Sequence, residues 1–125
     1  MVMIGNLVYA EASTAITTLD ISPQNIFVDQ DHFTEPGMIE NIAQTAAAMV
    51  GHQCKVNNTP VPVGFIAAVK SWKLTRLPKV NTRIETTIAV VNSVGDISIV
   101  EGTVRQDDQE LCSCEMRILV QKNIQ

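Results

Sequence analysis

One segment of the chain, residues 38–50, is predicted to form a helix that is apolar on nearly every side. Its apolar residues recur at the spacing of one helical face, at Ile39, Ile42, Ala46 and Met49 or Val50. Glu40 is the only charged residue in the segment, and a helix of this kind is buried. Pro36 and Gly37 open it and Gly51 is a stop signal, so we expect a helix from Pro36 to Gly51. The rest of the chain must supply the surface that surrounds this helix.

The segments on both sides of this helix have the alternation and the residue types of β-strands. We expect strands at residues 2–21 (two strands or one bent hairpin), 26–28, 61–77, 83–94, 97–106 and 111–120. The expected connections are a turn at residues 22–25, polar loops at 29–32 and 55–58, and turns at 95–96 and 107–110. In the last strand, alternate residues share one face, namely Cys112, Cys114, Met116, Ile118 and Val120.

One buried helix followed by a four-strand meander, with further strands in front, predicts an α+β fold in a single domain spanning residues 1–125. The physical solution is a curved antiparallel sheet wrapped around one central helix. A monomer would leave long edge strands exposed, so we expect at least a dimer. The chain starts abruptly with the strand-like residues Val2-Met3-Ile4, which predicts that a short N-terminal piece is missing.

Charge and cysteine content disfavour several classes of function. The formal net charge of -4 argues against nucleic acid as a partner. The start of the chain lacks a signal-peptide pattern, and the longest uncharged apolar stretch, about Ile42 to Gly51, is too short to cross a bilayer. We therefore expect a cytoplasmic protein without a membrane partner. Cys54, Cys112 and Cys114 are an odd number without disulfide spacing, so we expect reduced core thiols at 112 and 114 and no metal site.

The chemically informative stretch runs from His32 to Gln44. It places an imidazole in a loop, a Pro-Gly pair at a helix start, and the carboxylate of Glu40 in the first turns of a buried helix. Dehydration of a 3-hydroxyacyl thioester needs a base for the proton beside the carbonyl, an acid for the departing hydroxyl, and N–H donors for the thioester oxygen. His32 suits one proton-transfer role near neutral pH, and Glu40 suits the other.

Four parts of this stretch stand in a characteristic order, namely His32-Phe33, Pro36-Gly37, Glu40 and Ala43-Gln44. In this order they resemble the motif of the hot-dog-fold 3-hydroxyacyl-acyl-carrier-protein dehydratases. The helix part is most similar to small dehydratase-like proteins of polyketide and aryl-polyene type pathways. Further along, Gly64-Phe65-Ile66-Ala67 is similar to the strand that follows the acyl channel in this family.

The resemblance implies a hot-dog fold and conversion of a 3-hydroxyacyl thioester to the 2-enoyl thioester, in fatty-acid or polyketide-type synthesis. It implies His32 and Glu40 of opposite subunits as catalytic residues. The implied substrate-binding residues are Gly37, Met38, Gln44, Gly64 and Phe65. The substrate would be carried on the phosphopantetheine arm of acyl carrier protein or of coenzyme A, with no further cofactor. The assembly would be a homodimer or higher oligomer, or a heterodimer with a second hot-dog subunit.

Two departures from the family motif keep other functions open. The loop between His32 and Glu40 is several residues shorter than in the classical dehydratases, and their Pro-containing N-terminal segment is absent. The shorter loop favours a non-catalytic subunit that binds acyl chains or supports an active partner. A third alternative is an acyl thioesterase with Glu40 as base or nucleophile, although thioesterases of this fold usually have a His-Gly-Gly-like helix start, which this sequence lacks.

Each candidate residue also has a purely structural interpretation. Glu40 lies near the predicted helix start, where a carboxylate can cap free N–H groups. His32 follows two aspartates and could be a solvated loop residue, and Gln44, one turn after Glu40, could serve only to hydrogen-bond it. We expect His52 to sit just past the helix end in a structural role.

A basic run follows the helix, comprising Lys70, Lys73, Arg76, Lys79 and Arg83, with Trp72 among them. We expect Lys70, Lys73 and Arg76 to dock an acidic carrier protein and the phosphate of its arm. The alternative is an ordinary solvated strand face.

Overall fold

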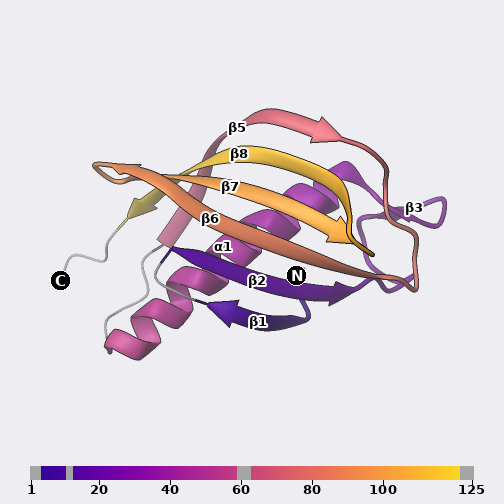
Figure 1. The fold of residues 1–125 in the computed structure, drawn as a ribbon, viewed down its shortest axis with the longest axis horizontal. Coiled ribbons are helices and arrows are strands. Elements are labelled where there is room, and N and C mark those ends of the chain that lie inside the picture. Colours follow the sequence, from indigo (N-terminus) through magenta and orange to yellow (C-terminus); the bar gives the residue numbers. More distant parts are fainter. Residues whose placement is uncertain (1–3, 11–12, 59–62, 122–125) are drawn as a thin grey trace.

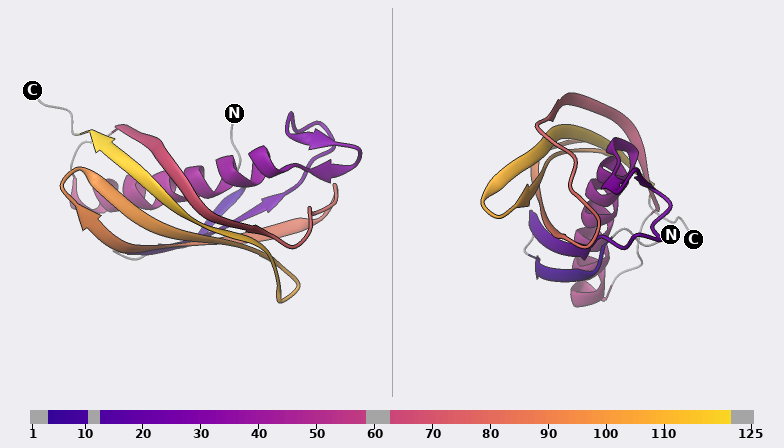
Figure 2. Two further views of the ribbon diagram at one scale, coloured as in Figure 1. Left: turned by 90° about the horizontal axis from the view of Figure 1, so that it is seen from above. Right: turned by 90° about the vertical axis from the view of Figure 1, so that its right-hand side faces the viewer.

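A long helix, α1 (Glu35–Asn57), lies against a strongly curved sheet. The computed structural model describes residues 4–10, 13–58 and 63–121. Figure 2 shows the sheet curving around one side of α1. The predicted plan of a curved antiparallel sheet around one central helix is therefore confirmed, whereas the expectations for residues 1–3 and 61–62 lie outside the described residues.

The helix is longer than the sequence predicted. It continues through Gly51 to Asn57, so the predicted end at Gly51 is wrong, and the predicted polar loop at 55–58 is its last turn and cap. A single glycine costs a helix only about 1 kcal/mol, which the adjacent helical residues outweigh. The signal that ends the helix is Asn58, whose left-handed conformation (φ 54°) lets its N–H donate back to the Lys55 carbonyl.

The main sheet has the order β1-β2-β6-β7-β8-β5 within the described residues, and every neighbouring pair is antiparallel. Its strands are β1 (Asn6–Ala10), β2 (Thr14–Asp20), β5 (Val63–Leu74), β6 (Arg83–Val94), β7 (Ile97–Gln106) and β8 (Gln109–Gln121). The predicted four-strand meander is wrong, because β5 pairs with β8 at the far edge and only β6, β7 and β8 follow one another. The alternation of apolar and polar residues identifies a strand but does not determine which strand it pairs with.

A small hairpin precedes α1. It is made of β3 (Val28–Asp29) and β4 (His32–Phe33), where the sequence predicted a strand at 26–28 and a polar loop at 29–32. Gln30 and Asp31 have φ angles of 48° and 63°, as a two-residue hairpin turn requires. The Phe33 N–H donates to the Pro78 carbonyl (2.9 Å), so the hairpin is fixed to the connection between β5 and β6.

The core lies between α1 and the concave face of the sheet. Helix residues in it are Met38, Ile42, Ala46 and Met49, and sheet residues include Ile84, Ile88, Val100, Val104, Cys112, Cys114 and Met116. A Cβ at Gly102 would lie 2.5 Å from Ile42 Cγ2, so the helix packs on the sheet at that glycine. The predicted inward face of β8 is confirmed at Cys112, Cys114 and Met116, while the side chain of Val120 lies outside the description.

Four polar residues are also completely buried between α1 and the sheet. They are Asn41 and Thr45 of α1, Thr17 of β2 and Thr86 of β6. Thr45 Oγ1 donates to the Asn41 carbonyl (2.8 Å), so in the 2.7 Å contact between the Thr17 and Thr45 hydroxyls Thr17 is the donor. Thr86 Oγ1 donates to Asn41 Oδ1. These bonds join one side of α1 to two neighbouring strands.

Candidate functional site

His32 has a defined orientation at the start of β4. It is half-buried, and its Nδ1 lies 2.9 Å from the Gln30 carbonyl oxygen. A carbonyl only accepts hydrogen bonds, so this contact assigns the proton of the neutral ring to Nδ1 and leaves a lone pair on Nε2. Phe33, the next residue, is fully buried and anchors the strand. His32 is therefore oriented by the Gln30 carbonyl, with Nε2 left to accept a hydrogen bond.

A wide-open cavity of about 480 Å³ lies between the β3–β4 hairpin and the β5–β6 connection. His32 lines it together with Asp29, Thr34, Arg76 and Lys79. His32 and Lys79 are bridge partners on antiparallel segments, which places their side chains next to each other. Glu40 is not among the residues lining this cavity, so one chain does not gather both predicted catalytic groups in it.

Glu40 lies on the second turn of α1 and is half-buried. Gln44 Nε2 donates to Glu40 Oε1 at 3.1 Å, as the spacing of four residues predicted. The capping interpretation of Glu40 is wrong, because the helix begins at Glu35, which is the acidic residue of its first turn, and end effects fade beyond that turn. The Glu40 carboxyl group instead accepts a hydrogen bond from the Gln44 side chain on the next turn of the helix.

Two of the predicted substrate-binding residues lie in the tightly packed helix start. Gly37 is buried, and a Cβ there would come within 2.7 Å of Phe27 Cβ and Phe33 Cε1. Met38 has no exposed surface, and its N–H donates to the Thr34 carbonyl within the helix. Gly37 thus brings α1 close to Phe33 of the hairpin, Met38 belongs to the core, and the substrate contacts of both residues stay a prediction.

Gly64 and Phe65 lie on β5, far along the sheet from the hairpin. Gly64 pairs with Val120 and Phe65 with Leu119 of β8. The Gly64 backbone is exposed, whereas the side chain of Phe65 lies outside the description. Their role along an acyl channel also stays a prediction.

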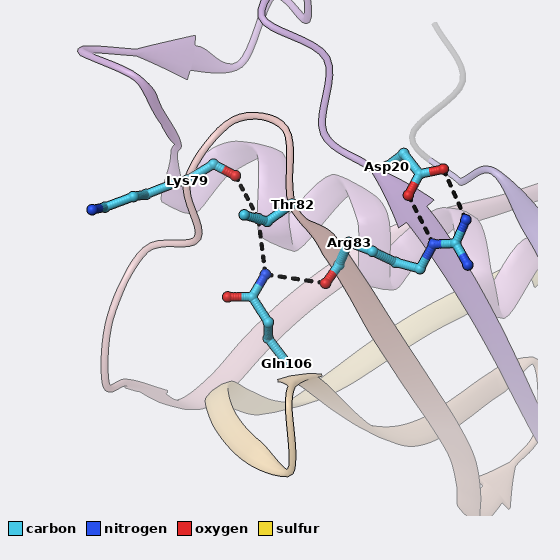
Figure 3. A network of polar contacts seen from close by, with 5 residues as sticks. All are labelled: Asp20, Lys79, Thr82, Arg83 and Gln106. Carbon is cyan, nitrogen blue, oxygen red and sulfur yellow. Dashed lines mark hydrogen bonds and ion pairs between the residues drawn. The ribbon is translucent and has the colours of Figure 1, made fainter.

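The residues of the basic run have different surroundings. Lys70 pairs across the sheet with Glu115. Lys73 lines an open groove whose acidic residues are Glu101, Glu110 and Glu115. Arg83 makes a two-pronged ion pair with Asp20 at 2.8 and 3.0 Å (Figure 3). Those hydrogen bonds lower the pKa of Asp20 and raise the pKa of Arg83.

Arg76 differs from these residues because neutral groups hold it. Its Nε donates to Gln109 Oε1 (3.1 Å) and its Nη2 to Gln106 Oε1 (3.2 Å). Gln106 is fixed in turn, since its Nε2 donates to Thr82 Oγ1 and to the Arg83 carbonyl (Figure 3). The Arg76 guanidinium is thus oriented beside the cavity that His32 lines. Among the described residues, no carboxylate forms an ion pair with it.

The remaining candidates have no evident chemistry. His52 is exposed within α1, so its predicted place past the helix end is wrong. Cys54, Cys112 and Cys114 are free thiols, and burial raises the pKa of Cys112 to about 12 and that of Cys114 to about 11. The parts of the chain that the structure describes contain no cluster of His, Cys, Asp or Glu suited to a metal, and no helix long and apolar enough to cross a membrane.

Sequence reasoning missed Lys79 as a neighbour of His32, and it missed the buried group around Asn41. Lys79 was visible only as a member of the basic run, because its pairing with His32 joins residues far apart in the chain. Asn41 and Thr45 could have been found from their spacing of four residues on the face that also carries Ile42 and Met49.

Comparison with solved structures tests the predicted fold. Among solved structures, it resembles the dehydratase heterocomplex ApeI:P from Xenorhabdus doucetiae with a TM-score of 0.87 and 13% identity, over 98% of this chain and 84% of that one. An uncharacterised protein from Pyrococcus horikoshii gives a TM-score of 0.77 at 13% identity, covering 98% of this chain and 86% of that one. A hypothetical thioesterase from Streptococcus pneumoniae, solved with coenzyme A, gives 0.73 at 10% identity, over 94% and 90%.

These likenesses establish the fold, and the predicted hot-dog arrangement is confirmed. No curated protein matches the sequence. The family model described as ApeP dehydratase matches residues 1–125, the whole chain. The predicted resemblance to hot-dog dehydratases is therefore confirmed, and the chain belongs to the ApeP-like dehydratase family.

Proposed function

We propose that this protein dehydrates a 3-hydroxyacyl thioester to the 2-enoyl thioester, in fatty-acid or polyketide-type synthesis. The substrate is carried on the phosphopantetheine arm of acyl carrier protein or of coenzyme A, and the reaction needs no further cofactor. The observation that carries the proposal, in a chain of a dehydratase family, is the contact between His32 Nδ1 and the Gln30 carbonyl, which leaves Nε2 free to accept a proton.

The proposed reaction uses two proton transfers. His32 Nε2 takes a proton from C2 of the acyl chain, and the carboxylic acid of Glu40 gives a proton to the hydroxyl on C3. The C3–O bond breaks, water leaves, and a double bond forms between C2 and C3. A proton passing from the imidazolium back to the carboxylate restores both groups. Gln44, which donates to Glu40 Oε1, fixes the direction of the acid.

The site is proposed to form between two subunits. In support, the cavity that His32 lines does not include Glu40 of the same chain. The partner is a second copy of this chain or another hot-dog subunit, and the similar structure from Xenorhabdus doucetiae is a dehydratase heterocomplex. That heterocomplex also favours the second candidate function, a supporting subunit that is itself inactive.

Product analysis tests the proposal against its rivals. Purified protein with a 3-hydroxyacyl thioester should give the 2-enoyl thioester, detected by mass spectrometry and by its ultraviolet absorbance. Free acid and thiol would instead identify a thioesterase. No conversion by the protein alone, with activity appearing only after a second hot-dog protein is added, would identify the supporting subunit.

A variant of Glu40 tests its role as the acid. Glu40→Gln keeps the size and the hydrogen bonding of the side chain but removes the transferable proton, so we expect kcat to fall by about 10²- to 10⁴-fold. Glu35→Gln, on the first turn of the same helix, is the matched control and should keep wild-type kcat. Equal rates for Glu40→Gln and wild type would remove Glu40 from the mechanism.

A further inference from the structure

We propose that Asn41 and Thr86 act as positioning residues that set the rotation of α1 and thereby aim Glu40 at the substrate. The inference rests on the proposed function, in which Glu40 is the acid. It assigns a task in the reaction to a buried polar group that no step of the mechanism uses.

Two hydrogen-bonded pairs run side by side along α1, each with the spacing of one helical turn. Glu40 and Gln44 form the first pair, through their side chains, and Asn41 and Thr45 form the second. The first pair is half-buried, while the second is completely buried against the sheet. Because neighbouring residues are about 100° apart around a helix, a fixed direction for Asn41 fixes the direction of Glu40.

The second pair is tied to two different strands. Thr86 of β6 donates to Asn41 Oδ1, and Thr17 of β2 donates to Thr45 Oγ1 at 2.7 Å. Hydrogen bonds are directional, and an unmade one costs a buried polar group about 1–3 kcal/mol. Rotating α1 on the sheet would break bonds on both strands at once, so these residues select one rotation.

Apolar packing contributes to that rotation, because Ile42 lies against Gly102 of the sheet. The middle of α1 also carries the small residues Ala43, Ala46, Ala47 and Ala48, and the hydrogen bonds to two strands add the directional part of the selection. Replacing both partners of a buried hydrogen bond by apolar groups of similar shape can be nearly neutral for stability. A buried polar group that fixes one register is the best-attested reason for keeping such residues.

The test separates positioning from stability. Asn41→Leu with Thr86→Val replaces both partners by apolar groups, so the free energy of unfolding should stay close to wild type or rise. We expect kcat nevertheless to fall by about 10- to 100-fold, since a misplacement of 1 Å can cost that much, with little change in KM. Thr86→Ser should do the opposite: it keeps the hydroxyl and loses a methyl group, so it lowers stability but keeps kcat.

The control and a second readout make the outcome decisive. Met49→Leu, a conservative core change on the same helix, should leave kcat unchanged. The side-chain amide signals of Gln44 in ¹H–¹⁵N NMR report its bond to Glu40 without any turnover. The chemical shifts of these amide signals should change in the double variant and should remain as in wild type in Thr86→Ser. If the double variant does not fold, Thr17→Val with Thr45→Val replaces it.

Two results would overturn the inference. One is a kcat that follows stability, so that Thr86→Ser is slower than the double variant. The other is an unshifted Gln44 amide in a folded double variant. Failure of the proposed function is distinct, because then the wild-type protein itself would form no enoyl thioester.

Discussion

Burial changes the chemistry of two of the three cysteines. The pKa of Cys112 is raised to about 12 and that of Cys114 to about 11, first of all by desolvation in the core. Only the thiolate reacts, and at pH 8 about one in a thousand Cys114 thiols, and fewer at Cys112, would be ionised. Iodoacetamide at pH 8 should therefore label Cys54, which is half-buried on α1, well before the other two. Peptide mass spectrometry measures this, and equal labelling of all three in folded protein would contradict it.

The same shifts give a pH dependence of stability. Both thiols ionise less readily in the folded state than at their ordinary value of 9.0, so between pH 9 and about 12 the folded protein holds more protons than the unfolded one. The stability that these groups contribute is fully present below pH 9 and is lost as the pH rises through about 11 and 12. A Cys112→Ala, Cys114→Ala variant should have a flatter profile of unfolding free energy in that range.

At the residue scale, sequence reasoning succeeded where a partner is local. The bond between Glu40 and Gln44 spans one helical turn and was predicted. The bonds from Thr17 to Thr45 and from Thr86 to Asn41 span 28 and 45 residues, and only the fold brings such residues together. The pairing of His32 with Lys79 was missed for the same reason.

At the scale of elements, a glycine in open surroundings and two glycines in close packing should respond oppositely to an added methyl group. Gly51 lies inside α1, and a Cβ there would have no atom within 4 Å. Gly51→Ala should therefore raise the free energy of unfolding by about 0.5–1 kcal/mol, because alanine loses less backbone entropy on folding. Urea denaturation followed by circular dichroism measures the change. A loss of stability would mean that the helix is broken at residue 51, as the sequence had suggested.

Two buried glycines are the matched controls. A Cβ at Gly37 would meet Phe27 and Phe33 at 2.7 Å, and one at Gly102 would meet Ile42 at 2.5 Å. Forcing a methyl group into such contacts costs about 1–3 kcal/mol, so Gly37→Ala and Gly102→Ala should both destabilise the protein.

The elements themselves were predicted as well as their local signals allow. β6 and β7 have the predicted bounds, because both segments are rich in β-branched residues and Gly95-Asp96 forms the turn between them. The helix end was missed because Gly51 was given more weight than Asn58, which provides the actual cap. The place of β5 at the edge beside β8 depends on distant pairing and was not available from its own residues.

At the scale of the whole molecule, the different neighbours of the basic residues change the expectation for carrier docking. Arg76 is held by two glutamines, whereas Lys73 shares its groove with three glutamates. An acidic carrier protein should therefore bind Arg76→Glu more weakly than Lys73→Glu, and the difference should shrink as salt rises and screens the charges. Titration calorimetry at low and high salt measures both effects. Unchanged affinity of both variants at low salt would leave the run an ordinary solvated face, and equal losses would contradict the difference between Arg76 and Lys73.

Dehydration is proposed to occur at a site shared by two subunits, with His32 from one and Glu40 from the other. The most direct test of this proposal mixes two inactive variants, His32→Ala and Glu40→Gln, after reversible dissociation. Each mixed dimer would contain one intact site, so random pairing in a symmetric dimer should restore about a quarter of the wild-type rate of enoyl thioester formation. A mixture that stays as inactive as its components, although native mass spectrometry shows mixed dimers, would contradict the account.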